Sequence, residues 1–324
     1  MLFIPARLDR IIAAMDKIKV GVIGVGHLGQ HHARIYAGMD GVELAGICDT
    51  DLGRARSLAR KYKTNAFSDY RQMFGIIDCA SIVVPTELHF PVTKECLHNG
   101  ISVLIEKPMT KSVEEADELL EEAGKNGLII QVGHIERFNA AVRALDEVPG
   151  NVRFIECHRL GPFKKRALDV GVVLDLMIHD IDIILALVKS EIASIDAVGV
   201  NILTDHEDLA NVRIRFKNGA VANLTASRVT DKEMRKIRLF KDDCYISLDY
   251  VKQESVIYRK INNRITGKLI NIKKEEPLKK ELEAFIACLK AGGRPLVSGE
   301  EGRDALKIAL QIEDAIKETL RSNA

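Results

Sequence analysis

The sequence predicts an α/β protein of two domains, the first built on a parallel sheet and the second, an α+β domain, on a mostly antiparallel open sheet. Three observations carry this prediction. Short β-branched runs alternate with helical stretches in the first half, which is typical of a parallel sheet covered by helices. Beyond about residue 150, predicted strands follow one another without helices between them. The length of 324 residues fits two domains of about 100–200 residues each.

We expect three segments along the chain. Residues 1–16 precede the first strong pattern, and Met15 could be an internal start, so this segment is interpreted as a dispensable leader or tag. Residues 17–149 form the first domain and residues 150–324 the second. The pattern changes near Pro149-Gly150, where alternation of strands and helices stops.

Each expected element of the first half has a local reason. The strands are short apolar runs, as expected where both faces of a sheet are covered: 19–23, 42–48, 79–84, 103–105 and 128–132. Helices are expected over residues 27–39, 54–62 and 112–125. The last of these opens with Ser112 and Glu115, spaced as a capping box requires.

The second half begins with one helical segment over residues 174–188. Strands with alternating polarity are then expected at 194–200, 210–216, 220–227, 236–240, 245–250 and 255–260. Asn218-Gly219 predicts a tight hairpin turn, because glycine readily adopts positive φ. Two helices, 278–291 and 299–320, close the chain.

Composition excludes several function classes. The 47 Lys and Arg residues balance 46 Asp and Glu residues, so the charge gives no basis for wrapping nucleic acid or binding an anionic membrane. No apolar stretch approaches the roughly 20 residues that span a bilayer. The six cysteines are widely spaced without a CxxC pair, which predicts no metal site and buried thiols in a reducing cytoplasm.

A dinucleotide fingerprint follows the first predicted strand. Gly24-Val25-Gly26-His27-Leu28-Gly29 is G-x-G-x-x-G at a strand-to-helix turn, where Gly26 lets the backbone approach a pyrophosphate and free N–H groups hold the phosphates. Asp49 ends the second strand, 20 positions after Gly29, where it would bind the adenosine ribose and repel a 2′-phosphate. The pattern predicts a Rossmann domain that binds NAD; a glycine-rich turn beside a surface aspartate is the alternative.

Glu106-Lys107-Pro108 follows a predicted strand at the edge of the sheet where ligands of open parallel sheets bind. Desolvation and a neighbouring cationic ring would favour the neutral amine of Lys107, which could then exchange a proton with a substrate hydroxyl. The proline could hold a cis bond. An exposed lysine at a strand end is the alternative interpretation.

Asp175, His179 and Asp182 share one face of the helix expected over residues 174–188. A carboxylate one turn from an imidazole can orient the ring and raise its basicity, so His179 could accept the proton of an alcohol as hydride leaves the carbon. The alternative is a helix start with acidic residues and an incidental histidine.

Together these motifs resemble the glucose–fructose oxidoreductase/inositol dehydrogenase (Gfo/Idh/MocA) family, with Val84-Pro85-Thr86-x-x-His89 as a fourth matching motif. The resemblance covers the chain from about Lys17 onward. It implies catalytic roles for Lys107, His179 and Asp175, with the amine and the imidazole both facing a bound nicotinamide. It also implies that the cofactor site includes Pro85, Thr86, His89, Glu106 and Lys107 as well as the glycine-rich turn.

Two positions depart from the family pattern. Thr86 stands where many members carry Asn, and Met177 stands where many carry Gly between the aspartate and the histidine. Met177 is expected to change the bulk beside the substrate. The second domain, by resemblance, binds substrate and forms oligomers.

Within the family, the segments 131–139 and 175–182 look like the branch that oxidises the 3-hydroxyl of UDP-N-acetylglucosamine, after which a partner aminotransferase forms a 3-amino sugar for lipid A. Basic residues flank the proposed site and could neutralise a diphosphate: Arg137, Arg159, Lys164, Lys165 and Arg166.

Other interpretations stay open. The substrate could be an inositol, a free sugar or a UDP-uronic acid, and a non-catalytic NAD-binding sensor is a further possibility. An antiparallel sheet covered by helices on one side leaves an apolar face, which predicts a homodimer or homotetramer formed through that sheet.

Overall fold

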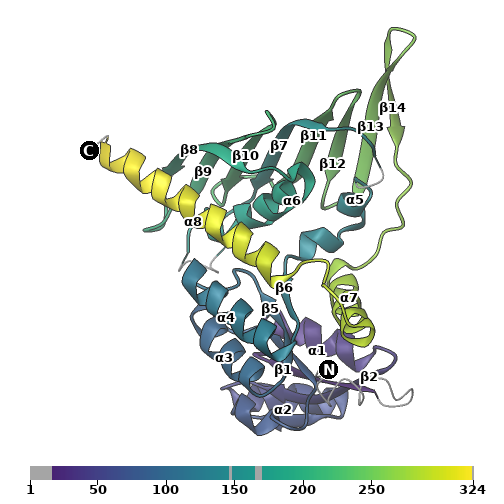
Figure 1. Cartoon of the computed structure of the whole chain (residues 1–324), viewed down its shortest axis with the longest axis vertical. Coiled ribbons are helices and arrows are strands. Elements are labelled where there is room, and N and C mark those ends of the chain that lie inside the picture. The colour runs from purple at the N-terminus through teal and green to yellow at the C-terminus, as the bar shows by residue number, and fades with distance from the viewer. Residues whose placement is uncertain (1–16, 146–147, 165–169, 323–324) are drawn as a thin grey trace, which may run out of the picture. The chain divides into compact units, whose positions relative to one another are not determined.

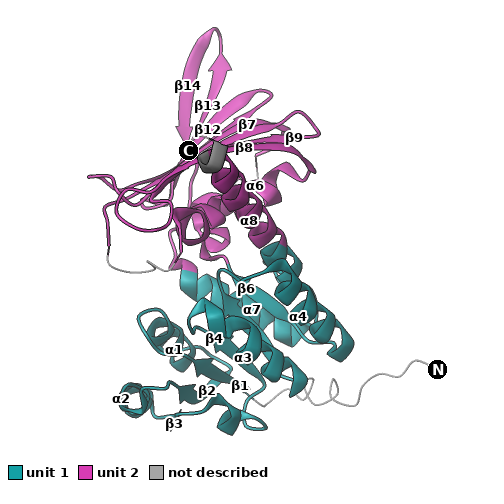
Figure 2. Cartoon of the chain, turned by 90° about the vertical axis from the view of Figure 1, so that its left-hand side faces the viewer, with its two compact units in different colours: residues 1–133, 278–303 teal, residues 134–277, 304–324 magenta. Residues whose placement is uncertain are grey.

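The computed structural model describes residues 17–145, 148–164 and 170–322, so the predicted leader over residues 1–16 lies outside the described residues. The chain divides into two compact units (Figure 2). Unit 1 comprises residues 1–133 and 278–303, and unit 2 comprises residues 134–277 and 304–324. The first boundary falls at 133/134, whereas the sequence placed it at 149/150, and residues 278–303 return to the first unit.

Unit 1 is built on a six-stranded parallel sheet with the order β3-β2-β1-β4-β5-β6. This is the doubly wound order of dinucleotide-binding domains, with a topological switch point between β1 and β4. Figure 1 labels β1, β2, β5 and β6 of this sheet. The predicted parallel Rossmann sheet is confirmed. Its strands are β1 Ile18–Ile23, β2 Val42–Cys48, β3 Asn65–Phe67, β4 Cys79–Ile82, β5 Ser102–Glu106 and β6 Ile130–Gly133.

The helices between these strands are α1 Gly29–Ala37, α2 Leu52–Tyr62, α3 Thr86–His98 and α4 Val113–Asn126. Helix α7 (Pro277–Ala291) comes later in the chain and belongs largely to the same unit. The Ser112 cap predicted for α4 is present, but the return bond of the predicted capping box goes to the residue before the cap. The Ser112 hydroxyl accepts the N–H of Glu115 at 3.3 Å, and the Glu115 carboxylate accepts the N–H of Lys111 at 3.1 Å. Gly127, with a φ of +63°, ends the helix in the left-handed region.

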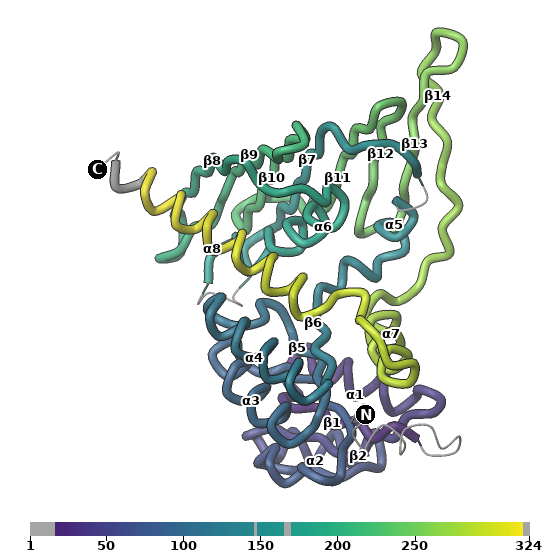
Figure 3. The backbone as a smooth tube through the Cα atoms, viewed as in Figure 1, coloured from purple at the N-terminus to yellow at the C-terminus, as the bar shows by residue number. Residues whose placement is uncertain are grey.

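Unit 2 is built on an eight-stranded sheet with the order β14-β13-β12-β11-β7-β10-β9-β8. Only the β7–β10 pair of these strands is parallel, so the predicted mostly antiparallel sheet is confirmed. The hairpin of β13 and β14 extends beyond the other strands (Figure 3). The strands are β7 Val152–Leu160, β8 Ile192–Val200, β9 Leu209–Phe216, β10 Val221–Ser227, β11 Met234–Lys241, β12 Cys244–Asp249, β13 Glu254–Ile261 and β14 Arg264–Leu269.

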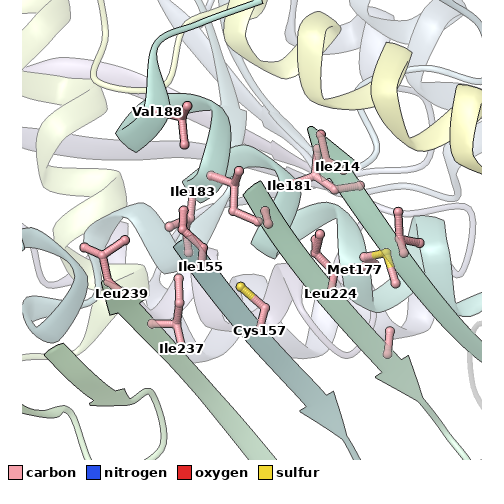
Figure 4. Close-up of a cluster of buried hydrophobic side chains, with 14 of the residues drawn as sticks. Ile155, Cys157, Met177, Ile181, Ile183, Val188, Ile214, Leu224, Ile237 and Leu239 are labelled. Carbon is pink, nitrogen blue, oxygen red and sulfur yellow. The ribbon is translucent and has the colours of Figure 1, made fainter. Parts of the chain in front are cut away.

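One face of this sheet packs on helices and forms the core of unit 2 (Figure 4). The helices are a π-helical turn η4 (Val173–Met177), α6 (Ile178–Val188) and α8 (Gly299–Ser322), with the short η3 (Ile135–Phe138) and α5 (Ala140–Arg143) before β7. Met177 is fully buried in this core beside the apolar side chains of α6 and the sheet. Its side chain fills space between helix and sheet, and the expected effect of Met177 on the bulk beside the substrate stays a prediction. No helix of the described residues has the length and apolarity of a membrane span.

Candidate functional site

The turn between β1 and α1 has the backbone that a dinucleotide site requires. Gly24 has a φ of +85°, and a Cβ on it would lie 2.4 Å from the carbonyl oxygen of Val83. A Cβ on Gly29 would lie 1.9 Å from the carbonyl oxygen of Gly24, so only glycine lets α1 approach this turn. A Cβ on Gly26, by contrast, would meet no atom within 4 Å, which leaves open space beside the backbone. The close contacts at Gly24 and Gly29 and the open space at Gly26 fit a turn that binds a dinucleotide.

Asp49 directly follows β2 and faces this turn. Its carboxylate accepts the N–H of Val25 at 2.9 Å and the N–H of Asp51 at 2.9 Å. The guanidinium of Arg54, on the first turn of α2, lies 3.2 Å from the same carboxylate and is about half exposed. A buried carboxylate that holds the glycine-rich turn lies where a ribose hydroxyl could also donate to it.

The Glu106-Lys107-Pro108 segment follows β5, and Thr86 begins α3 after the neighbouring strand β4. Parallel neighbours place both segments at the same edge of the sheet, as predicted. Lys107 is half-buried, and the Lys107–Pro108 peptide bond is cis. The Glu106 carboxylate is buried and lies 3.2 Å from Nε2 of His32, a fully buried side chain of α1. Sequence reasoning missed His32, because its partner is 74 positions away in the chain.

His89 was expected to contact the cofactor, but in the structure its ring contacts two backbone carbonyl groups. Its ring is buried, with Nδ1 2.8 Å from the carbonyl oxygen of Pro108 and Nε2 2.9 Å from that of Val84. Both ring nitrogens therefore contact the backbone of the loops that follow β4 and β5. This geometry assigns His89 to the support of the two loops.

Unit 1 as described fits a dinucleotide. The open backbone at Gly26 suits a pyrophosphate, and His27 and Leu28 are exposed on the same turn. Within the described residues there is no group of three or more His, Cys, Asp or Glu side chains that could hold a metal ion.

In unit 2, Asp175 lies on the π-helical turn η4, and His179 lies on the first turn of α6. Both residues are partly buried. The start of η4 is held by Glu207, whose backbone carbonyl accepts the N–H of Val172 at 3.0 Å and whose carboxylate accepts the N–H of Val173 at 3.1 Å. A π-turn inside a helix is frequent at functional sites. It also means that the ideal α-helical spacing used for the sequence prediction does not hold over residues 173–177.

His134 was missed by the sequence prediction, although it directly follows β6. Its buried ring meets the ring of His179 edge to face, with centroids 6.2 Å apart and an interplanar angle of 90°. The nearby sequence offered one signal, a polar residue soon after an apolar strand. This contact fixes one side of the His179 ring.

Two of the basic residues predicted to bind a diphosphate are paired inside unit 2. Arg159 is 3% exposed and donates to Asp180 at 3.0 and 2.8 Å and to Glu136 at 2.9 Å. Burial alone would lower the pKa of Arg159, but these two carboxylates raise it well above its usual value. Arg137 lies 3.2 Å from the buried carboxylate of Asp182. These pairs hold α6 against β7 and η3, a role that the sequence prediction did not include.

A pocket of unit 2 opens beside Asp175, with an empty volume of about 480 Å³ that includes space open to solvent. Four cationic and two anionic side chains line it, together with Ser227 and apolar residues. Lys164 belongs to this lining, whereas Lys165 and Arg166 lie outside the described residues. The charged lining residues are Arg159, Lys164, Arg228, Arg235, Asp175 and Glu233.

Comparison with known families agrees with both units. A profile of an oxidoreductase family with an NAD-binding Rossmann fold matches residues 18–134, and a profile of the GFO/IDH/MocA C-terminal domain matches residues 138–246. The chain belongs to the GFO/IDH/MocA family. Membership confirms the predicted family, the NAD cofactor and the predicted class of NAD-dependent dehydrogenase.

Individual members of the GFO/IDH/MocA family are similar over nearly the whole chain. UDP-N-acetylglucosamine 3-dehydrogenase from Acidithiobacillus ferrooxidans is 37% identical over 314 residues, covering 95% of this chain and all of the relative. Its solved structure has a TM-score of 0.89 with 38% identity, over 94% of this chain and 99% of that one. Myo-inositol 2-dehydrogenase from Thermotoga maritima is 26% identical over 325 residues, covering 93% of this chain and 97% of the relative. Levoglucosan dehydrogenase in complex with NADH and levoglucosan shares the fold, with a TM-score of 0.83 and 20% identity over 95% and 98% of the two chains.

Proposed function

We propose that this chain oxidises a secondary hydroxyl of a sugar with NAD, and specifically the 3-hydroxyl of UDP-N-acetylglucosamine to a ketone. The observation that carries the proposal is the full-length similarity, at 37% identity, to a UDP-N-acetylglucosamine 3-dehydrogenase. A partner aminotransferase would consume the ketone to make a 3-amino sugar of the lipid A type.

The charge of the unit 2 pocket supports a nucleotide sugar. Lys164, Arg228 and Arg235 line it beside Asp175, and a diphosphate is recognised by such cations. Arg235 also lies 3.0 Å from Glu233, and Arg228 donates to the carbonyl of Val170 at 2.7 Å, so both guanidinium groups are oriented. We therefore extend the predicted diphosphate site to Arg228 and Arg235. Arg137 and Arg159 instead support the site through their buried carboxylate partners.

The proposed chemistry needs one base and one hydride acceptor. NAD, when bound, supplies the hydride acceptor. Lys107 or His179 removes the hydroxyl proton, and Asp175 orients the imidazole of His179. Pro85, Thr86 and Glu106 border the nicotinamide end of the cofactor in this proposal, while the glycine-rich turn holds the pyrophosphate.

The experiment is a panel of UDP-N-acetylglucosamine, UDP-uronic acids, free sugars and myo-inositol, assayed for NADH formation with the product identified by mass. The proposal expects NADH and a ketosugar with UDP-N-acetylglucosamine. An inositol dehydrogenase is the second candidate, because the myo-inositol 2-dehydrogenase of Thermotoga maritima is similar over 93% of this chain. Turnover of myo-inositol alone would establish that candidate. NADH binding without turnover of any polyol would favour the sensor interpretation.

We also propose that copies of this chain associate as a homodimer or homotetramer through the sheet of unit 2. The face opposite α6 and α8 carries a row of aromatic rings on adjacent strands, Phe154, Phe240, Tyr245 and Tyr258, with successive centroids 5.6, 4.9 and 5.0 Å apart. Such a row is typical of a face that packs on a partner. Static light scattering that reports a monomer would contradict this.

The six cysteines are free thiols, which supports the cytoplasm as the compartment.

A further inference from the structure

His89 of α3 lies between two backbone carbonyl groups, and this arrangement constrains its protons. Nδ1 lies 2.8 Å from the carbonyl oxygen of Pro108, and Nε2 lies 2.9 Å from that of Val84. Both oxygens only accept hydrogen bonds, because neither carries a hydrogen. A neutral imidazole has one N–H and can satisfy one of them, whereas the imidazolium ion has two N–H groups and satisfies both.

The two carbonyls belong to the loops that carry site residues. Val84 precedes Pro85 and Thr86 after β4, and Pro108 follows Lys107 after β5. Strands β4 and β5 pair in parallel, with Ile82 opposite Ile105, so the two loops leave the sheet side by side. The ring of His89 cross-links them. Because the side chain is 1% exposed, water is poorly placed to replace either contact.

We propose that His89 is a positioning residue that, as an imidazolium ion, donates to the carbonyls of Val84 and Pro108 and thereby ties the loop of Thr86 to the turn of Lys107. In the neutral form one of the two contacts becomes a contact between lone pairs and opens. The proposal rests on the proposed function only in the role of Lys107.

The surroundings of the ring shift the pKa of His89 in opposite directions. Burial lowers the pKa of His89 below its ordinary value, while the two carbonyls and the carboxylate of Glu106 on β5 raise it. Glu106 is itself contacted at 3.2 Å by His32 of α1, and Lys107 is the neighbouring positive charge on the same turn. The double contact is therefore expected on the acidic side of neutrality and the single contact above it.

The direct test is ¹⁵N NMR of the histidine rings in the full-length protein, titrated from about pH 4 to about pH 8, a range that extends well below the ordinary pKa of histidine. The proposal expects both His89 nitrogens to be protonated at the acidic end and one at the basic end. The amide signals of Thr86 and Lys107 should move with the same midpoint. A ring with a single N–H throughout, or a titration that leaves both amide signals in place, would overturn it. This readout needs no substrate, so it separates a failure of this proposal from a failure of the proposed function.

Kinetics give a second readout. On the acidic side of neutrality, where the wild type makes both contacts, His89→Gln and His89→Asn each keep a single donor nitrogen and should lower kcat about 10- to 100-fold, while the KM for NAD changes little. A misplacement of about 1 Å can cost 100-fold. The matched control is His98→Gln at the exposed end of the same helix, which should leave both constants unchanged. If the His89 variants fold and match the control in kcat, the positioning role is wrong.

Discussion

The guanidinium of Arg159 and the carboxylate of Asp180 form a two-point ion pair inside unit 2, with distances of 3.0 and 2.8 Å. Tyr250 donates to the same carboxylate at 3.2 Å, and all three side chains are buried. Removing the guanidinium of Arg159 leaves the buried carboxylates of Asp180 and Glu136 without this partner. Arg159→Leu should therefore lower the free energy of unfolding by about 3–5 kcal/mol.

Denaturant unfolding measures this effect, and Arg238→Leu is the matched control. Arg238 lies on the neighbouring strand and pairs with Glu156 at 3.0 Å, but its side chain is half exposed. The control should cost at most about 1 kcal/mol. Equal losses in the two variants would show that the buried pair has no special role in holding α6.

Glycines 26 and 29 should respond differently to alanine. Gly29→Ala places a Cβ 1.9 Å from the carbonyl of Gly24 and should destabilise the fold by about 1–3 kcal/mol or more. Gly26→Ala meets no protein atom within 4 Å, so its unfolding should be unchanged while its affinity for NADH falls. Thermal unfolding and NADH fluorescence titration check the pair. A Gly26→Ala variant that binds NADH like the wild type would contradict the predicted approach of the pyrophosphate to this residue.

Asp49 and Arg54 should together set the choice of cofactor. Asp49→Ser removes the charge that repels a 2′-phosphate and one of the two carboxylate partners of Arg54, which lie at 3.2 Å (Asp49) and 3.4 Å (Asp51). The variant should use NADP⁺ about 10- to 100-fold better than the wild type, the equivalent of one hydrogen bond to a charged group. Steady-state kinetics with both cofactors measure the change. Adding Arg54→Ala should remove the gain, and a gain that persists without Arg54 would refute its role.

Glu313 should make stability depend on pH. Burial, with the nearby carboxylate of Glu207, raises its pKa from 4.5 to about 7. Because the folded pKa is the higher one, this group's contribution to stability is fully present below about pH 4.5 and is lost as pH rises to about 7. Glu313→Gln should therefore gain about 1–2 kcal/mol relative to the wild type at about pH 8, after allowance for partial exposure. Asp314→Asn, on the exposed side of the same helix, is the control, and equal pH profiles of the wild type and Glu313→Gln would contradict the assignment.

Sequence patterns predicted most strands whose apolar residues follow one clear period. Three strands and one long helix were missed for physical reasons, as were the short helical turns. Strand β3 has three residues, and β14 is exposed along its whole length, so neither carries an apolar pattern. Helix α3 contains Pro91, which is unfavourable in a helix interior. Strand β7 carries Arg159 at an inward position, and only the distant Asp180 makes that burial favourable.

The same distinction applies to the site. The glycine-rich turn, Asp49 and the Glu106-Lys107-Pro108 segment were predictable, because each is a local motif at a strand end. The pairs His32–Glu106 and His134–His179 were not, since their members meet only after folding. His89 was predicted as a cofactor contact, but its ring faces two backbone carbonyls. Convergence of Lys107 and His179 on the reacting carbon stays a prediction.

Dehydrogenation of UDP-N-acetylglucosamine is measured as NADH formation by the wild type and by Lys107→Met, each first checked for NADH binding. The wild type should form NADH and a product lighter by two hydrogen atoms. The variant should bind NADH equally well and turn over about 10²- to 10⁴-fold more slowly, the usual loss for an acid–base group. A variant as fast as the wild type, or a wild type that binds NADH but reduces no NAD⁺ with this or any other sugar, would contradict the proposed chemistry.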